Sequence, residues 1–150
     1  MNMKPEQAVG AVGMSTMSVK PGDTSVAQAV NDLPVVAASQ LIALIENACS
    51  TAILEFLEFG ETTFTDKFEL EICGAVGIGN ELHATARCNR FENQELDFEA
   101  EVHQNARLIA KAKLHRRFVE RVTFMAKTAA ETKVAERSTS NLGSGKVITF

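Results

Sequence analysis

Glu46 is the residue whose type and setting most directly suggest chemistry. It lies in an apolar stretch, with Ile42, Ile53 and Leu57 beside it on the helix that this stretch predicts. Burying an unpaired carboxylate is costly, so a glutamate there either reaches water or a partner, or is kept for a reaction. For a reaction, it could act as a nucleophile or general base on a carbonyl compound. The alternatives are a solvated position at the edge of the apolar stripe and an ion pair across a dimer interface.

Other polar residues suggest narrower roles. Ser39 lies at the predicted start of the same helix, where its hydroxyl is expected to cap the first N–H groups; the alternative is a catalytic hydroxyl. Free N–H groups at this helix start could also polarise a carbonyl oxygen. His83, His103 and His115 fall on the polar side of predicted strands, so they are expected to be solvated or structural.

The cysteines and glycines give no sign of a bound cofactor. Cys49, Cys73 and Cys88 lack the spacing of a metal site or a disulfide framework. They are expected to be small buried hydrophobic residues in the reducing cytoplasm. The glycine-rich stretch 74–79 lacks the lysine and the strand-to-helix context of a phosphate-binding loop, so it predicts a bend in the sheet. No metal or redox cofactor is expected.

Composition excludes several classes of protein. The 150 residues suit one domain, and a net charge of −4 argues against a nucleic-acid surface. No apolar run is long enough to cross a bilayer, and the first residues do not resemble a signal peptide. The sequence therefore predicts a cytoplasmic protein without a membrane or nucleic-acid partner.

The element that carries Glu46 is predicted as a long helix from Ser39 to Phe59, ended by Gly60. Its apolar residues cover more than half of the circumference, so another layer must enclose it. A strand from Val12 to Val19 precedes the helix and ends at a turn signal, Lys20-Pro21-Gly22-Asp23.

Four segments after the helix alternate apolar and polar residues with a period of two, which predicts strands with one buried face. Their apolar positions are Phe64, Phe68, Leu70 and Ile72; Leu82, Ala84, Ala86 and Cys88; Leu96, Phe98, Ala100 and Val102; and Leu108, Ala110, Ala112 and Leu114. Short connections favour an antiparallel meander that covers the helix. We expect an α+β domain over residues 1–137, with 1–10 as a loose arm, helical composition from Val119 to about Arg137, and a flexible tail over 138–150.

Three stretches carry a resemblance to a known family. The run Asp32-Leu33-Pro34-Val35-Val36-Ala37-Ala38-Ser39-Gln40-Leu41-Ile42-Ala43-Leu44-Ile45-Glu46 resembles D-L-P-V-L-A-T-P-x-L-I-A-L-M-E of the fluoroacetyl-CoA thioesterase-like proteins. Ser18-Val19-Lys20-Pro21-Gly22-Asp23-Thr24 is similar to their V-T-P-E-D-T. Leu114-His115-Arg116-Arg117-Phe118-Val119 is similar to their T-H-E-R-F-V. The match covers residues 12–122 in order, with the spacing preserved.

The resemblance implies a hotdog fold, in which an antiparallel sheet wraps around one long central helix. It also implies hydrolysis of short acyl-CoA thioesters at a dimer interface, with coenzyme A as part of the substrate. The family's threonine, glutamate and histidine positions hold Ala38, Glu46 and Ile72 here, so two of the three depart. Arg117 matches the arginine of the family's H-x-R pair and has a structural or dimer-contact role, or binds coenzyme A phosphates. Together with Ala38 and Ile72 it is assigned to substrate contact.

The predicted function is therefore that of an acyl-CoA thioesterase-like homodimer with Glu46 as base or nucleophile. The alternative is a non-catalytic hotdog protein that binds an acyl-CoA, which the departures Ala38 and Ile72 favour. A dehydratase or hydratase would need a paired carboxylate and histidine near the helix, which the sequence does not show. The strand that begins near Thr62, or its neighbour in the sheet, is expected to pair with its counterpart across a two-fold axis.

Overall fold

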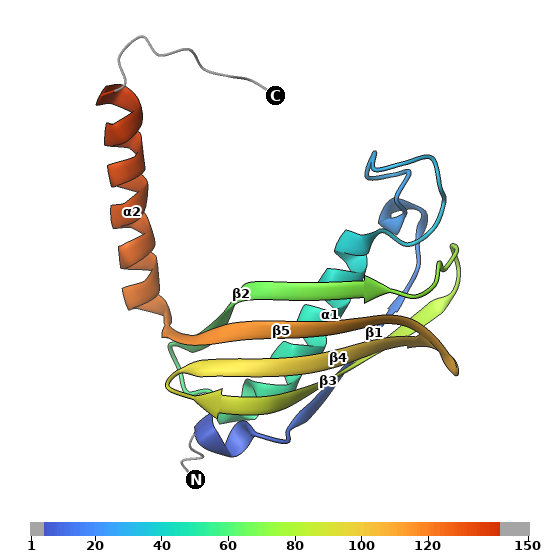
Figure 1. Ribbon diagram of the computed structural model, residues 1–150, viewed down its shortest axis with the longest axis horizontal. Helices are drawn as coiled ribbons and strands as arrows, with labels where there is room; N and C mark the ends of the chain where they lie inside the picture. The colour runs from blue at the N-terminus through green and yellow to red at the C-terminus, as the bar shows by residue number, and fades with distance from the viewer. Residues whose placement is uncertain (1–4, 142–150) are drawn as a thin grey trace.

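The computed structural model describes residues 5–141, in which one sheet wraps around one central helix (Figure 1). Three short 3-10 helices occur at Pro5–Ala8, Pro21–Asp23 and Leu54–Phe56. The longer elements are β1 (Val12–Ser18), α1 (Ala38–Ile53), β2 (Glu61–Ile72), β3 (Glu81–Glu92), β4 (Glu95–Gln104), β5 (Arg107–Glu120) and α2 (Arg121–Asn141). The expected sheet and central helix are thus confirmed.

Helix α1 begins one residue earlier and ends sooner than the sequence predicts. Its N-cap is Ala37, in extended conformation and without a side-chain hydrogen bond, so the prediction that Ser39 caps the helix is wrong. Ser39 lies inside the first turn, and its hydroxyl donates instead to Oε1 of Gln28. After Ile53 the helix tightens into a 3-10 turn, and Phe59 is fully exposed rather than helical. Gly60, at φ +88°, turns the chain into β2.

All neighbouring strands are antiparallel, in the order β1-β3-β4-β5-β2. Strands β3, β4 and β5 form the expected meander through short hairpins. Strand β2 does not pair with β3, which follows it in sequence; it lies at the far edge beside β5. The glycine-rich connection after β2 carries the chain across the sheet to β3, so the predicted meander holds for three of the four strands. The two edges are β1 and β2.

The face of the sheet toward α1, called here the inner face, carries the core. Leu82, Ala84, Leu96, Phe98 and Leu114 are buried there as the alternation predicts. Ile109 is also buried, because the register between β4 and β5 shifts at that point.

A bulge at Asp66 in β2 overturns one prediction. Thr65 pairs with Arg116 and Lys67 pairs with His115, so Asp66 has no cross-strand partner and the side-chain parity inverts at this residue. Phe64 therefore points to the outer face, away from Phe68, Leu70 and the helix. Its ring packs against Phe124 of α2, with 5.1 Å between the centroids.

Strand β1 packs directly on the backbone of α1. A Cβ atom added at Gly13 would lie 2.8 Å from Cα of Ala52 and closer still to the carbonyl oxygen of Ala48. The close approach explains a glycine in the middle of this strand.

The terminal segments differ from the expected arm and tail. Ala8 is buried and the N–H of Gly10 donates to the carbonyl of Cys88, so the expected loose arm is anchored to the sheet at these two residues, although its other side chains from Glu6 to Val9 are exposed. Helix α2 confirms the predicted helical composition but runs to Asn141, four residues into the predicted tail. Residues 1–4 of the arm and 142–150 of the tail lie outside the described residues. In the described part of the chain, no helix is both long and apolar enough to span a membrane.

Candidate functional site

Glu46 is held by a buried arginine of its own chain. Arg116 reaches from the inner face of β5 and is only 4% exposed. Its Nη2 donates to the carbonyl oxygen of Glu46 at 2.9 Å and to the carboxylate Oε1 at 3.1 Å. The hydroxyl of Thr65 on β2 also donates to this carboxylate oxygen. Within one chain, Glu46 therefore has an ion-pair partner and a hydroxyl donor, in addition to the water that its partly exposed side chain reaches.

The remaining bonds of Arg116 join three elements. Its Nη1 donates to Oγ of Ser50 on α1 at 3.1 Å and to Oγ1 of Thr63 on β2 at 2.9 Å. The guanidinium lies 5.7 Å from the ring centroid of Phe98, a distance suited to a cation–π contact. Only the buried Nε lacks a hydrogen-bond partner among the described residues. Arg116 thus ties the middle of α1 to both strands at the β2 edge.

The carboxylate of Glu46 remains accessible despite these bonds. The Glu46 side chain is 35% exposed, whereas that of Arg116 is 5% exposed. One oxygen, Oε1, accepts the hydrogen bonds of both Thr65 and Arg116. The arrangement fixes the carboxylate while leaving part of it open to an incoming ligand.

Ala38 and Ile72 do not gather around Glu46 in one chain. Ile72 pairs with Ala110 and so has the inner-face parity that was expected, but it is 49% exposed. At about 3.3 Å per residue, it lies roughly 20 Å along β2 from Thr65, which contacts Glu46. Ala38 is exposed at the helix start, about 12 Å along the axis from Glu46 at 1.5 Å per residue. The N–H groups at the helix start are therefore too far away to polarise a carbonyl that Glu46 attacks.

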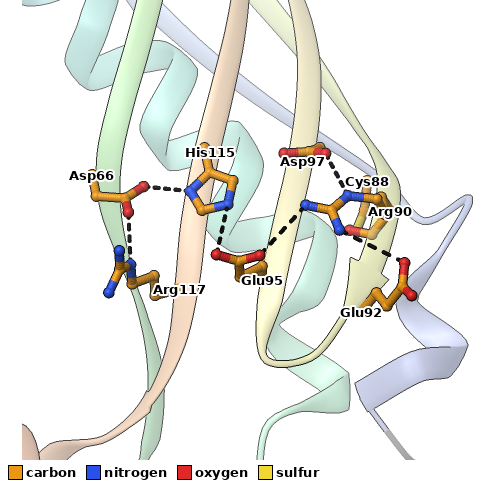
Figure 2. Close-up of polar contacts among 8 residues, drawn as sticks. All are labelled: Asp66, Cys88, Arg90, Glu92, Glu95, Asp97, His115 and Arg117. Atoms are coloured by element: carbon orange, nitrogen blue, oxygen red, sulfur yellow. Dashed lines mark hydrogen bonds and ion pairs between the residues drawn. The ribbon is translucent and has the colours of Figure 1, made fainter.

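The predicted residues His115 and Arg117 lie on the outer face, in a chain of ion pairs across four strands (Figure 2). Nδ1 of His115 is 2.5 Å from Oδ1 of Asp66, and Nε of Arg117 is 2.7 Å from the other oxygen. On the other side, Nε2 of His115 lies 3.7 Å from Glu95, which neighbours Arg90. The polar parity predicted for His115 is confirmed. Arg117 is on the opposite face of the sheet from Glu46.

The pKa of Asp66 lies below its usual value, chiefly because of the hydrogen bond with His115 and further because of that with Arg117. A carboxyl group whose pKa is lower in the folded state than in the unfolded state stabilises the fold at pH values above the unfolded pKa of 3.8. This stabilisation is lost as the pH falls through the folded-state pKa. We expect Asp66→Asn to lower the urea midpoint at pH 7, and the difference from wild type to shrink below pH 3.8. Asp32→Asn, in an exposed loop, is the control; an Asp66 effect that does not change with pH would contradict the assignment.

Cys49 and Cys88 offer no activated nucleophile. Burial raises the pKa of Cys49 to about 12 and also raises that of Cys88, so both thiols stay protonated. These two are the expected buried hydrophobic residues, whereas Cys73 is exposed. Within residues 5–141, no three His, Cys, Asp or Glu side chains are grouped to hold a metal ion.

Arg116 is the residue of this candidate site that the sequence did not single out. Its position was visible in the strand pattern, because it continues the buried parity of Ala112 and Leu114. In the family pattern T-H-E-R-F-V, this position corresponds to the glutamate. The exchange places a cation beside Glu46.

Comparison with solved structures identifies the fold. The fluoroacetyl-CoA thioesterase FlK is 23% identical and superposes with a TM-score of 0.74, covering 81% of this chain and 95% of that one. A hypothetical protein of Thermus thermophilus, described as a thioesterase superfamily member, is 20% identical with a TM-score of 0.78 (86% and 96% covered). A hot-dog-like protein from Thermanaerovibrio acidaminovorans is 16% identical with a TM-score of 0.72 (96% and 100% covered). The fold is the hotdog fold.

The family follows from the sequence itself. A model of the fluoroacetyl-CoA-specific thioesterase family matches residues 19–122, more than half of the chain, and the protein belongs to this family. A comparison with curated protein sequences gave no match. Helix α2 lies almost wholly outside the matched region.

Proposed function

We propose that the protein hydrolyses a short acyl-CoA thioester, with Glu46 as general base or nucleophile. The observation that carries the proposal is the fixed but accessible carboxylate of Glu46, held by Thr65 and Arg116 on the inner face. When neighbouring residues already hold a reacting group in position, the entropic part of the activation barrier is lower. Membership of a thioesterase family supports the choice of substrate class. Coenzyme A enters as part of the substrate, and no separate cofactor is required.

As a base, Glu46 takes a proton from a water molecule while the water oxygen adds to the thioester carbonyl. The tetrahedral intermediate then collapses to the carboxylic acid and expels the coenzyme A thiolate, which takes the proton from Glu46 and so restores the carboxylate. As a nucleophile, the carboxylate itself adds to the carbonyl and expels the thiolate, and water then hydrolyses the resulting anhydride. Both routes need the carboxylate form, and neither needs a residue at positions 38 or 72.

A second candidate function is binding of an acyl-CoA without hydrolysis. It is favoured by the apolar residues Ala38 and Ile72 at two family positions and by the bonds that Glu46 already receives from its own chain. On this reading the Glu46–Arg116 pair is structural, and Ala38, Ile72 and Arg117 are assigned to ligand contact.

The proposal includes a homodimer in which β2 pairs with its counterpart across a two-fold axis. Strand β2 is an edge of the sheet with twelve residues, and such edges are usually covered or paired. Among the described residues, surface depressions of about 840 and 370 Å³ lie elsewhere on the sheet and on α1, and neither is lined by Glu46, Arg116 or Ile72. A second subunit at the β2 edge would supply walls for the acyl group. A cytoplasmic location, expected from the cysteine content, also stays part of the proposal.

The experiment is release of free thiol from a panel of acyl-CoA esters of increasing chain length, at fixed enzyme concentration. We expect turnover with at least one short-chain ester. No turnover across the panel, together with micromolar binding of the same esters by calorimetry, would assign the second function. If the protein neither hydrolyses nor binds these esters, both candidate functions are excluded.

A further inference from the structure

Helix α2 stands away from its own chain. From Arg121 to Thr139, only Phe124 is partly buried, where its ring packs on Phe64. Three larger apolar residues of the helix are exposed: Val122 (74%), Met125 (56%) and Val134 (61%). A helix gains most of its stability from tertiary packing rather than from its own propensity. A helix of 21 residues with so little packing suits an element that another surface covers.

The direction of α2 is informative. It leaves the end of β5, crosses the strand direction and projects past the β2 edge (Figure 1). At 1.5 Å per residue its length is about 30 Å, equal to roughly six strand spacings. At the opposite end of β2, the loop before α1 projects past the same edge (Figure 1).

This second projection also carries exposed apolar residues. They lie on the loop 24–37, at the end of β2 and in the connection after it: Val26 (46%), Val30 (70%), Leu33 (52%), Ile72 (49%) and Ile78 (48%). A bridge between Val35 and Gly77 and a hydrogen bond from the N–H of Val36 to the carbonyl of Val76 join the loop to that connection. The two ends of β2 therefore each carry exposed apolar residues, on different elements.

A two-fold axis through the middle of β2 would bring these unlike ends together twice. In an isologous interface, the contact that one subunit makes is returned by the other. Antiparallel pairing of β2 with its counterpart puts the Glu61 end of one strand, where α2 begins, against the Ile72 end of the partner strand.

We propose that α2 of each subunit docks on the helix-entry loop and the Ile72 end of β2 of a second copy of this chain. The inference rests on the proposed β2-paired homodimer. The docking side of α2 is the side that carries Val122, Met125 and Ala129, which at 100° per residue lies away from Phe124. Each subunit then covers the end of its partner's sheet that holds Ala38 and Ile72, two residues that the family resemblance assigns to substrate contact.

Sedimentation equilibrium of variants that carry one added charge on α2 tests the docking. Wild type is expected at twice 16.3 kDa at micromolar concentration. Met125→Glu is expected to raise the dimer dissociation constant at least tenfold, because it puts a charge into the apolar contact. Val134→Glu is the matched control, since Val134 is equally exposed but lies on the other side of the helix, and its dissociation constant should stay within threefold of wild type. Equal constants for the two variants, or a monomeric wild type, would overturn the inference.

Cross-linking gives a second, independent readout. Cys73 is the one exposed cysteine and follows Ile72 directly. In Met125→Cys, a short bismaleimide is expected to join position 125 to the partner's Cys73 and give a band of twice the chain mass. Wild type and Lys127→Cys, on the opposite side of α2, should give little of this band. Equal yields from Met125→Cys and Lys127→Cys would count against the docking side. Neither readout depends on turnover, so failure of thiol release leaves this result interpretable.

Discussion

Glu46→Gln is expected to lower turnover of any thioester that the protein hydrolyses by a factor of roughly 10² to 10⁴. The amide has nearly the shape of the carboxylate, and its oxygen can still accept from Thr65 and Arg116. It can neither take a proton from water nor attack a carbonyl at neutral pH. The loss should therefore lie in kcat, measured as thiol release at saturating substrate, more than in KM.

The control for this result is Glu55→Gln, an exposed glutamate in the 3-10 turn that follows the same helix. Its turnover should equal that of wild type. Urea unfolding and sedimentation of Glu46→Gln would show whether the fold and assembly persist. Wild-type turnover in a folded Glu46→Gln protein would remove Glu46 from the reaction and leave it as the structural partner of Arg116.

Most of the fold was predictable because its signals are local. The turn at Lys20–Asp23 ends β1, and the alternation of apolar residues gives β3 and β4 with the correct buried side. The start of α1 was predicted one residue too late, because a serine was expected at the cap and the chain uses Ala37 without a side-chain bond. Strand order could not be read from alternation, which says which side is buried but not which strand is next.

The site was less predictable, for a physical reason that the β2 bulge illustrates. The alternation of buried and exposed side chains that Phe68 and Ile72 define holds along β2 only as far as Asp66. At Asp66 one extra residue reverses the two faces, so Phe64 points to the outer face. On β5, where no shift intervenes between Leu114 and Arg116, parity alone would have placed Arg116 inside and Arg117 outside. The family pattern instead matches Arg117, as the arginine of the H-x-R pair. The partner of Glu46 lies 70 residues away in sequence, and only packing of β5 on α1 reveals it.

Arg116→Met is expected to lower the free energy of unfolding by about 3 to 5 kcal/mol. The substitution fills similar space but removes four hydrogen bonds, those to Ser50, Thr63 and the two oxygens of Glu46. It also leaves the Glu46 carboxylate without its cation on the inner face. Because that side chain is 35% exposed and can turn to water, the lower end of the range is expected.

The neighbouring residue supplies the control. Arg117→Met removes the same charge one position along the strand, but the Arg117 side chain is 62% exposed and pairs with Asp66 on the outer face. An exposed pair of this kind contributes about 0 to 1 kcal/mol, so urea unfolding should separate the two variants by at least about 2 kcal/mol. The double variant Glu46→Gln with Arg116→Met should lose less unfolding free energy than the sum of the losses of the two single variants, since the two residues share one contact. Equal losses for Arg116→Met and Arg117→Met would mean that the buried guanidinium does not join α1 to the β2 edge, and the fixed orientation of Glu46 would lose its cause.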